Sequence, residues 1–303
     1  MIFQGRIKDG LDDCRTQLGR HHHREKRGYG QLCVKCLFCF CASFRNPRRI
    51  PPVACLSPTG TTIYIFLVFF FLNIIGLIVG LHRYFTHRSF ETGSLFRLLL
   101  GIWGSWAMQG PIDRWVADHR RHHRYSDQPF DVHSPYWKNQ EKIASGLMRF
   151  AHAHVLWMFT GLPTDKAKYA RDTISDPISG ECSRRYWLLC ASSLLLPAVV
   201  GFLIGGQEEG IRSFFWAGCF RVSLLHQLTW SVNCFGHLFG GKTEGSRDDA
   251  RDNMLLTLLV FGEGLHSYHH VHQSTALNRP AKLDLAGQFI KLLERFHIVW
   301  SVK

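Results

Sequence analysis

Two long apolar runs restrict what this chain of 303 residues can fold into more than any other feature. Residues 61–81 contain no charged side chain, and neither do residues 186–206. Because an α-helix rises about 1.5 Å per residue, about 20 such residues cross the roughly 30 Å hydrocarbon layer of a bilayer. A third run, residues 211–236, is weaker because it contains two arginines and a histidine. The sequence therefore predicts an all-α, multi-pass integral membrane protein with three spans.

The chain is strongly basic, with a formal net charge of +13. In a membrane protein, an excess of lysine and arginine marks the loops on the cytoplasmic side. The basic residues are not gathered into one recognition element, so we expect no nucleic-acid partner. Residues 1–60 form a basic, Pro-containing tail that differs from residues 61–303. We expect this tail to be either disordered or the product of a misassigned start, and residues 61–303 to form the functional domain.

Histidines gather in three short clusters near the ends of the predicted spans. The eight residues are His82, His87, His119, His122, His123, His266, His269 and His270. Neutral imidazole binds zinc, copper, nickel and iron well, yet no single cluster offers enough ligands for a closed site. The first two clusters follow the first span and the third follows the third span, so all three can meet at one membrane face. Since the central loop is rich in lysine and arginine, that face is predicted to be cytoplasmic.

The spacing within each cluster predicts where the rings point. On an α-helix, positions i, i+3 and i+4 share one face, so both HxxHH clusters present three imidazoles to one place. The HxxxxH spacing of His82 and His87 puts the two rings about 140° apart, which suits two different metals or a helix end that loosens. Asn233 and His237 are four residues apart at the end of the third span and share a face. This makes His237 a ninth ligand and lets Asn233 hold a metal-bound water.

The spacing alone does not choose the metal. Two zinc ions would take about eight ligands in closed tetrahedra, which is a structural site. An oxygen-using di-iron site with exchangeable positions suits imidazole equally well. Polar residues beside the clusters could orient the ligands in either case: Asp113, Asp118, Asp127, Asp131 and Glu263.

The cluster sequences resemble those of the membrane fatty-acyl desaturases of the stearoyl-CoA (Δ9) type, with a bacterial-type member as the nearer likeness. The motifs are HRYFTHRSF at 82–90, DHRRHHRYSD at 118–127, DVHSP at 131–135, SVNCFGHLFG at 231–240 and GEGLHSYHH at 262–270. The likeness runs from about residue 62 to the C-terminus. It implies a helical membrane domain whose cytoplasmic cap holds a histidine-rich di-iron site.

The resemblance implies that two irons are bound by the eight clustered histidines and His237, with Asn233 in contact through a water. It also implies insertion of a cis double bond, at the Δ9 position, into a saturated acyl chain, using O2 and two electrons. The substrate would be an acyl-CoA or an acyl-lipid. The electrons would come from a separate donor of the ferredoxin or cytochrome b5 type with its reductase.

By the same resemblance, four residues are expected to line and bend the acyl-chain tunnel: Gln109, Trp115, Thr229 and Trp230. In this chain Gly110 and Ala117 occupy positions where animal relatives carry polar groups near the CoA carrier, so the carrier is left open. A bacterial inner membrane is the expected location, and the endoplasmic reticulum is the eukaryotic alternative.

Two rival functions remain open. A di-iron hydroxylase or alkane monooxygenase carries similar histidine clusters, and its product would retain oxygen. A non-catalytic metal-binding membrane protein is the other, although a transporter would place histidines within the spans and not at their ends.

Overall fold

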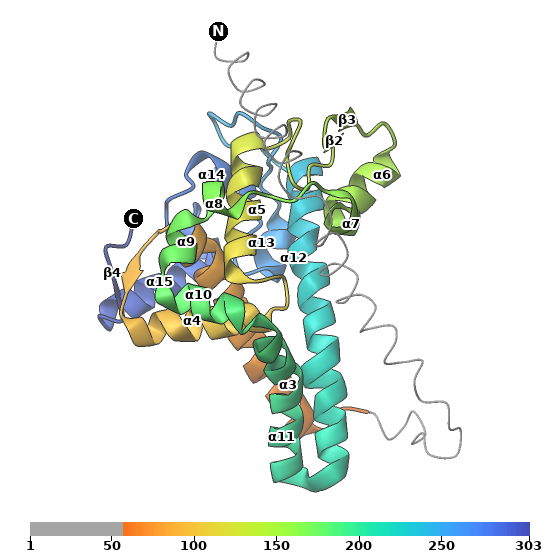
Figure 1. The fold of residues 1–303 in the computed structure, drawn as a ribbon, viewed down its shortest axis with the longest axis vertical. Coiled ribbons are helices and arrows are strands. Elements are labelled where there is room, and N and C mark those ends of the chain that lie inside the picture. Colours follow the sequence, from red (N-terminus) through yellow and green to blue (C-terminus); the bar gives the residue numbers. More distant parts are fainter. Residues whose placement is uncertain (1–56) are drawn as a thin grey trace.

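A computed structural model describes residues 57–303, so nearly all of the predicted tail lies outside the described residues. The described chain is mostly helical (Figure 1), which confirms the predicted fold class. Strands are confined to two short antiparallel pairs in this part of the chain. Strand β1 (Glu91–Thr92) pairs with β4 (Val299–Trp300), and β2 (Trp137–Lys138) pairs with β3 (Glu141–Lys142).

The first apolar run forms one continuous helix of 27 residues, Gly60–Thr86. It begins as the α-helix α3 (Gly60–Ile74) and continues as the π-helix η2 (Ile75–Thr86). Thr59 caps its first turn, because the Thr59 hydroxyl accepts a hydrogen bond from the Thr62 backbone. The helix is long and apolar enough to span a membrane, as the sequence predicts for residues 61–81.

The second and third runs form a helical hairpin. Helix α11 (Tyr186–Ser213), the π-helical segment η4 (Phe214–Phe220) and α12 (Arg221–Leu238) follow one another through a largely apolar stretch of 53 residues. The helix breaks at Gly206, whose φ of 73° favours glycine because it has no Cβ. The chain reverses there, so α11 and α12 run antiparallel beside α3 and project from the rest of the molecule (Figure 1).

The other helices form a cap at one end of these long helices (Figure 1). The two larger ones before the hairpin are α4 (Ser94–Trp106) and α5 (Ile112–Tyr125). Residues 146–160 form three consecutive helical pieces, which are α6 (Gly146–Ala151), η3 (His152–Leu156) and α7 (Trp157–Thr160). The remaining elements are α8 (Lys166–Tyr169), α9 (Arg171–Ser175), α10 (Pro177–Arg184), α13 (Met254–Leu259), α14 (His266–Val271), η5 (Ala281–Leu283) and α15 (Leu285–Arg295).

Helix α4 crosses η2 at unusually close range, and glycines permit the approach. A Cβ added at Gly76 would lie 2.1 Å from the backbone carbon of Trp103, and one at Gly104 would lie 2.9 Å from the carbonyl oxygen of Gly76. The buried core lies around this crossing and includes Leu81 and Leu100, both 0% exposed. The crossing therefore holds rigidly the helix that ends in the first histidine cluster.

Residues 281–303 are helical only in part. Helix α15 ends at Arg295, and His297 then adopts a φ of 53°, which turns the chain out of the helical direction. The last residues pair with β1, and the Trp300 indole donates a hydrogen bond of 2.9 Å to Glu91. Pairing of β4 with the distant strand β1 ends the helix. The periodicity of the C-terminal residues does not reveal that pairing.

Candidate metal centre

The structure brings all nine predicted histidines together at one end of the long helices. They come from the end of η2, from α5, from the end of α12 and from α14. Their ring nitrogens form two groups in which the ligand atoms lie within 4.8 Å of one another. We call these the five-histidine group, which contains His82, His87, His119, His123 and His269, and the four-histidine group, which contains His122, His237, His266 and His270.

The Nε2 atoms of the five-histidine group face one another. The distance between the Nε2 atoms of His82 and His269 is 3.0 Å, and that between His87 and His119 is 3.2 Å. His123 joins the two pairs, with its Nε2 2.9 Å from His119 and 3.1 Å from His269. Five nitrogen lone pairs thus point into one small volume, which is the arrangement a transition-metal cation requires.

Of the two alternatives for His82 and His87, contact with two different metals is wrong, and a helix end that loosens is confirmed, because the helix that carries them is not an α-helix. The His87 backbone N–H bonds the carbonyl of His82 at 3.2 Å, which is the i→i+5 pattern of a π-helix. In that pattern residue i+5 lies above residue i, much as i+4 does in an α-helix. The two ring centroids are consequently only 4.8 Å apart, and both histidines join the same group.

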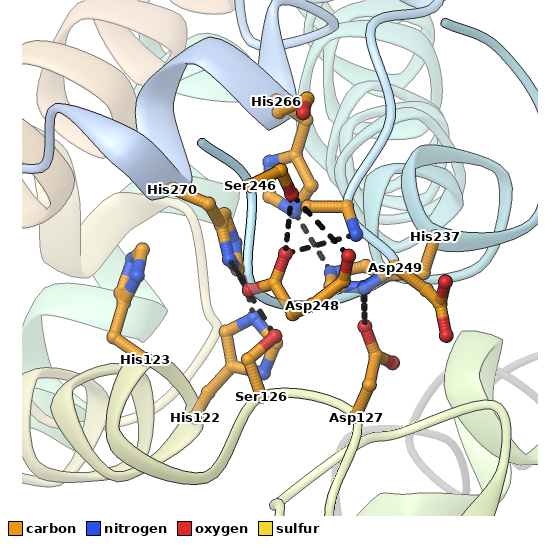
Figure 2. A network of polar contacts seen from close by, with 12 residues as sticks. His122, His123, Ser126, Asp127, His237, Ser246, Asp248, Asp249, His266 and His270 are labelled. Atoms are coloured by element: carbon orange, nitrogen blue, oxygen red, sulfur yellow. Dashed lines mark hydrogen bonds and ion pairs between the residues drawn. The ribbon is translucent and has the colours of Figure 1, made fainter. Parts of the chain in front are cut away.

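The four-histidine group draws on three different elements (Figure 2). The Nε2 atoms of His237 and His266 are 3.0 Å apart, and those of His122 and His270 are 3.4 Å apart. His237 is 0% exposed and His122 is 1% exposed. The inference that His237 adds a ninth imidazole from the end of the third apolar run thus agrees with its position. The prediction that each HxxHH cluster presents its three imidazoles to one place is wrong. His122 separates from His119 and His123, and His269 separates from His266 and His270, so each cluster supplies both groups.

Carboxylates hold the outer nitrogen of four of these rings. The Nδ1 of His82 lies 2.6 Å from Glu263, and the Nδ1 of His270 lies 2.6 Å from Asp248. The Nδ1 of His122 lies 2.8 Å from Asp131, and the Nδ1 of His237 lies 2.8 Å from Asp127. A carboxylate on Nδ1 fixes the tautomer and leaves Nε2 free as the ligand atom. Three of these acids were among those expected from the sequence.

Asp248 was not predicted from the sequence, and two acids that were predicted to orient histidines have other partners. Asp248 lies in the loop between α12 and α13, more than ten residues from any clustered histidine, and only the paired aspartates at 248–249 could have drawn attention to it. Asp113 instead pairs with Lys166 at 2.8 Å. Asp118 pairs with Arg114 at 2.7 Å. Neither carboxylate is recorded against a histidine in the described part of the chain.

His133 also lies nearer the centre than expected. Its ring centroid is 4.1 Å from that of His122, with the two rings only 30° from parallel. Together with Asp131, these two histidines form a third cluster of buried ligand-type side chains. The sequence marked His133 as structural with a supporting role open, and its position against His122 is consistent with support of that ring.

The electrostatics of the site fit a bound cation. Burial, followed by the charge of neighbouring rings, lowers the pKa well below 6.5 for His87, His119, His122, His123, His266 and His269. These rings are therefore neutral at pH 7, which is the form that binds metal. Burial and the nearby charge of Asp127 raise the pKa of Asp131 to about 8. A divalent cation beside His122 would relieve this crowding of negative charge and favour the ionised carboxylate.

The predicted substrate residues lie beside the histidine groups. Gln109 donates a hydrogen bond of 2.6 Å to the hydroxyl of Thr229, which joins the turn after α4 to α12. The indole of Trp115 stacks on His119, with centroids 4.9 Å apart and rings 15° from parallel. Trp230 instead stacks on His226. A tunnel for the acyl chain between these side chains stays a prediction. Asn233 is half-buried and lies one helical turn before His237. Its contact with a metal through a water also stays a prediction.

Comparison with known proteins agrees with the site. The sequence model of the family described as Fatty acid desaturase matches residues 60–287. The chain is 36% identical over 239 residues to a hex-5-enoyl-[acyl-carrier protein] acetylenase of Moorena producens, covering 77% of this chain and 74% of that protein.

Two further relatives differ in the carrier that their names print. An sn-1 stearoyl-lipid 9-desaturase of Synechocystis is 29% identical, with 78% of this chain and 70% of that protein covered. A stearoyl-CoA desaturase 5 of Bos taurus is 31% identical, with 66% and 58% covered. The matched region contains all nine histidines and both long apolar helices. The chain therefore belongs to the fatty acid desaturase family of oxidoreductases.

Proposed function

We propose that this protein is a membrane acyl desaturase that inserts a cis double bond, at the Δ9 position, into a saturated acyl chain with O2 and two electrons. The observation that carries the proposal is the convergence of nine histidines, six of them buried, from four segments into two groups with inward-facing Nε2 atoms. An all-nitrogen centre with two groups of ligands matches a pair of transition metals. The matched family supports acyl chains as the substrate class.

We infer that the two metals are irons, held by the five-histidine and four-histidine groups. When bound, they supply the O2-dependent oxidation that removes hydrogen from an unactivated methylene, which no side-chain base can do. The residues of this chain keep the rings neutral, bury them and orient them through the carboxylates on Nδ1. Burial also excludes bulk water, which would otherwise compete for the metals and for reactive species.

The polar pair of Gln109 and Thr229 supports a role in placing the substrate. Its 2.6 Å hydrogen bond joins the turn between α4 and α5 to α12, and Trp115 of α5 stacks on His119. An acyl chain beside this pair would have to bend around it, and a bend fixes which carbon atoms face the metals. Trp230, 8% exposed, would add an apolar wall on α12.

The substrate that carries the acyl chain is either an acyl-CoA or an acyl-lipid. The names of the relatives include both of these carriers and also an acyl-carrier protein. Gly110 and Ala117 offer no side-chain polar group, which favours a carrier other than CoA. Electrons would come from a separate donor of the ferredoxin or cytochrome b5 type.

The arrangement of the long helices supports a multi-pass membrane protein with the metal centre on one face. The first histidine cluster follows η2, and His237 ends α12, so both lie at the same end of the apolar helices (Figure 1). The basic loops place that end on the cytoplasmic side. A bacterial inner membrane is the proposed location, and the endoplasmic reticulum is the alternative.

A second candidate is the formation of a triple bond from an existing double bond. The 36% identity to an acetylenase over most of both chains specifically favours it. Both reactions remove two hydrogens from adjacent carbons and need the same metals. A hydroxylase would instead leave oxygen in the product.

Expression in a desaturase-deficient bacterial strain tests the proposal. Mass spectrometry of derivatised lipids would locate any new unsaturation and distinguish alkene, alkyne and alcohol products. We expect a cis alkene at C9. If metal-loaded protein supplied with O2, acyl substrate and a reducing system gives no unsaturated product on any carrier, the proposal is wrong.

A further inference from the structure

The carboxylates at the metal centre are distributed unevenly between the two histidine groups. In the four-histidine group, three of the four rings contact a carboxylate through Nδ1, and the acids are Asp127, Asp131 and Asp248. Figure 2 shows Asp127 beside His237 and Asp248 beside His270. Among residues 57–303, the five-histidine group is recorded with one such acid, Glu263 on His82. The group with fewer imidazoles thus has more negative charge at its rings.

The single acid of the five-histidine group also shares its charge with a cation. The carboxylate of Glu263 contacts His82 through Oε2, and its Oε1 accepts a hydrogen bond of 2.9 Å from Arg83. The guanidinium of Arg83 is 2% exposed and is paired with Asp284 as well. A full positive charge at this distance compensates much of the negative charge that Glu263 would otherwise direct at His82.

The acids of the four-histidine group are held by peptide N–H groups. The backbone of Asp249 donates to Asp127 at 2.8 Å, that of Asp127 donates to Asp131 at 2.9 Å, and that of Ala250 donates to Asp248 at 3.1 Å. A peptide N–H orients a carboxylate and carries only a partial charge. Asp127 and Asp248 therefore direct most of their charge toward His237 and His270.

We infer that the two groups are inequivalent metal sites, and that the four-histidine group binds the first divalent cation and the five-histidine group the second. The inference rests on the metal centre of the proposed function. Carboxylate partners of metal-binding histidines typically raise metal affinity about 10- to 100-fold. The fifth imidazole of the other group adds a ligand but brings no negative charge to balance a dication. We therefore expect the first site to bind at least about tenfold more tightly.

The experiment titrates metal-free, full-length protein in detergent with Co²⁺ at neutral pH. Cobalt replaces other divalent metals at imidazole sites, and its visible absorption is stronger with four ligands than with five or six. We expect two phases of about one equivalent each. The two phases should differ in their visible spectra, because the two sites differ in their number of imidazoles.

Variants identify which group fills first. Asp248→Asn should weaken the first phase about 10- to 100-fold and leave the second unchanged, and Asp248→Glu should restore most of the affinity. Glu263→Gln should weaken the second phase alone. Asp249→Asn is the matched control, because its side chain pairs with Lys242 at 2.8 Å and its backbone N–H still reaches Asp127.

Two outcomes would overturn the inference. The first is two equivalents bound with equal affinity, and the second is an Asp248→Asn variant that weakens only the later phase. Wild-type protein that binds no cobalt at all would contradict the proposed metal centre as well. The proposed desaturation could still fail while the two-phase titration succeeds, so the two proposals are tested separately.

Discussion

Replacement of Arg83 by methionine should destabilise this protein more than any surface change. The Arg83 guanidinium donates to the carbonyl oxygen of Ala276 at 2.7 Å and to both oxygens of Asp284 at 2.8 and 2.9 Å. It also donates to Glu263 at 2.9 Å. The side chain of Asp284 is 0% exposed and that of Glu263 is 11% exposed. Methionine fills similar volume and leaves two buried carboxylates without their cation.

The expected cost follows from this burial. Removal of one partner from a buried ion pair costs about 3–5 kcal/mol, because the remaining charge stays desolvated. That range corresponds to a hundredfold to a few thousandfold in the unfolding equilibrium, at about 1.4 kcal/mol per factor of ten. Since Glu263 also orients His82, the variant should lose affinity at the five-histidine group as well.

Thermal unfolding in detergent measures the effect, with metal content determined in parallel. Arg88→Met is the matched control, because Arg88 pairs with Asp172, whose side chain is 43% exposed, and such pairs contribute only about 0–1 kcal/mol. Adding Asp284→Asn to Arg83→Met should recover part of the loss by removing one uncompensated charge. A loss below about 1 kcal/mol for Arg83→Met, similar to that of Arg88→Met, would refute the reasoning.

Four further predictions concern the site and the helices that hold it. His123→Ala and His269→Ala should each abolish product formation and lower bound metal from two equivalents toward one; full activity with full metal content would contradict the ligand assignment. Thr229→Val removes the acceptor of the hydrogen bond from Gln109, so product formation should fall about fivefold, from a net loss of about 1 kcal/mol, with metal content unchanged. A changed metal content would instead indicate a structural role. Metal-free protein should lose stability as the pH falls below 6.5. Six histidines of the site stay neutral in the folded protein, whereas the same histidines take up protons in the unfolded chain. The free energy of unfolding should fall by up to about 1.4 kcal/mol per histidine for each pH unit. Chemical unfolding at pH 7.5 and pH 5.5 measures this loss, and equal stability would rule it out. Gly76→Ala should destabilise the protein by about 1–3 kcal/mol, because the added Cβ would lie 2.1 Å from the α4 backbone; a thermal stability equal to wild type would show that the crossing can open.

Much of the site could be predicted because its signals are local. The HxxHH spacing places three imidazoles on one face of any α-helix, and both α5 and α14 are helical as expected. The three predicted apolar runs appear as two long helical stretches, and the second of these breaks at Gly206 into a hairpin. Asn233, in contrast, remains a prediction, because its role depends on a water.

Other features depend on contacts between distant segments. The convergence of His82 and His87 follows from the π-helical form of η2, which packs closely against α4 at Gly76. The role of Asp248 depends on how the loop after α12 folds back onto His270. Neither effect has a periodic signature in the chain, because a π-helix and an ordered loop are stabilised by tertiary contacts.

The sequence by itself determined the apolar helices, the nine histidines and the face on which they gather, because helix length and residue spacing are properties of neighbouring residues. Only the tertiary structure decided how the histidines divide into groups of five and four and which carboxylates hold them. That division depends on the crossing of helices from four segments, since imidazoles assemble only where packing brings their ring nitrogens within a few ångströms of one another.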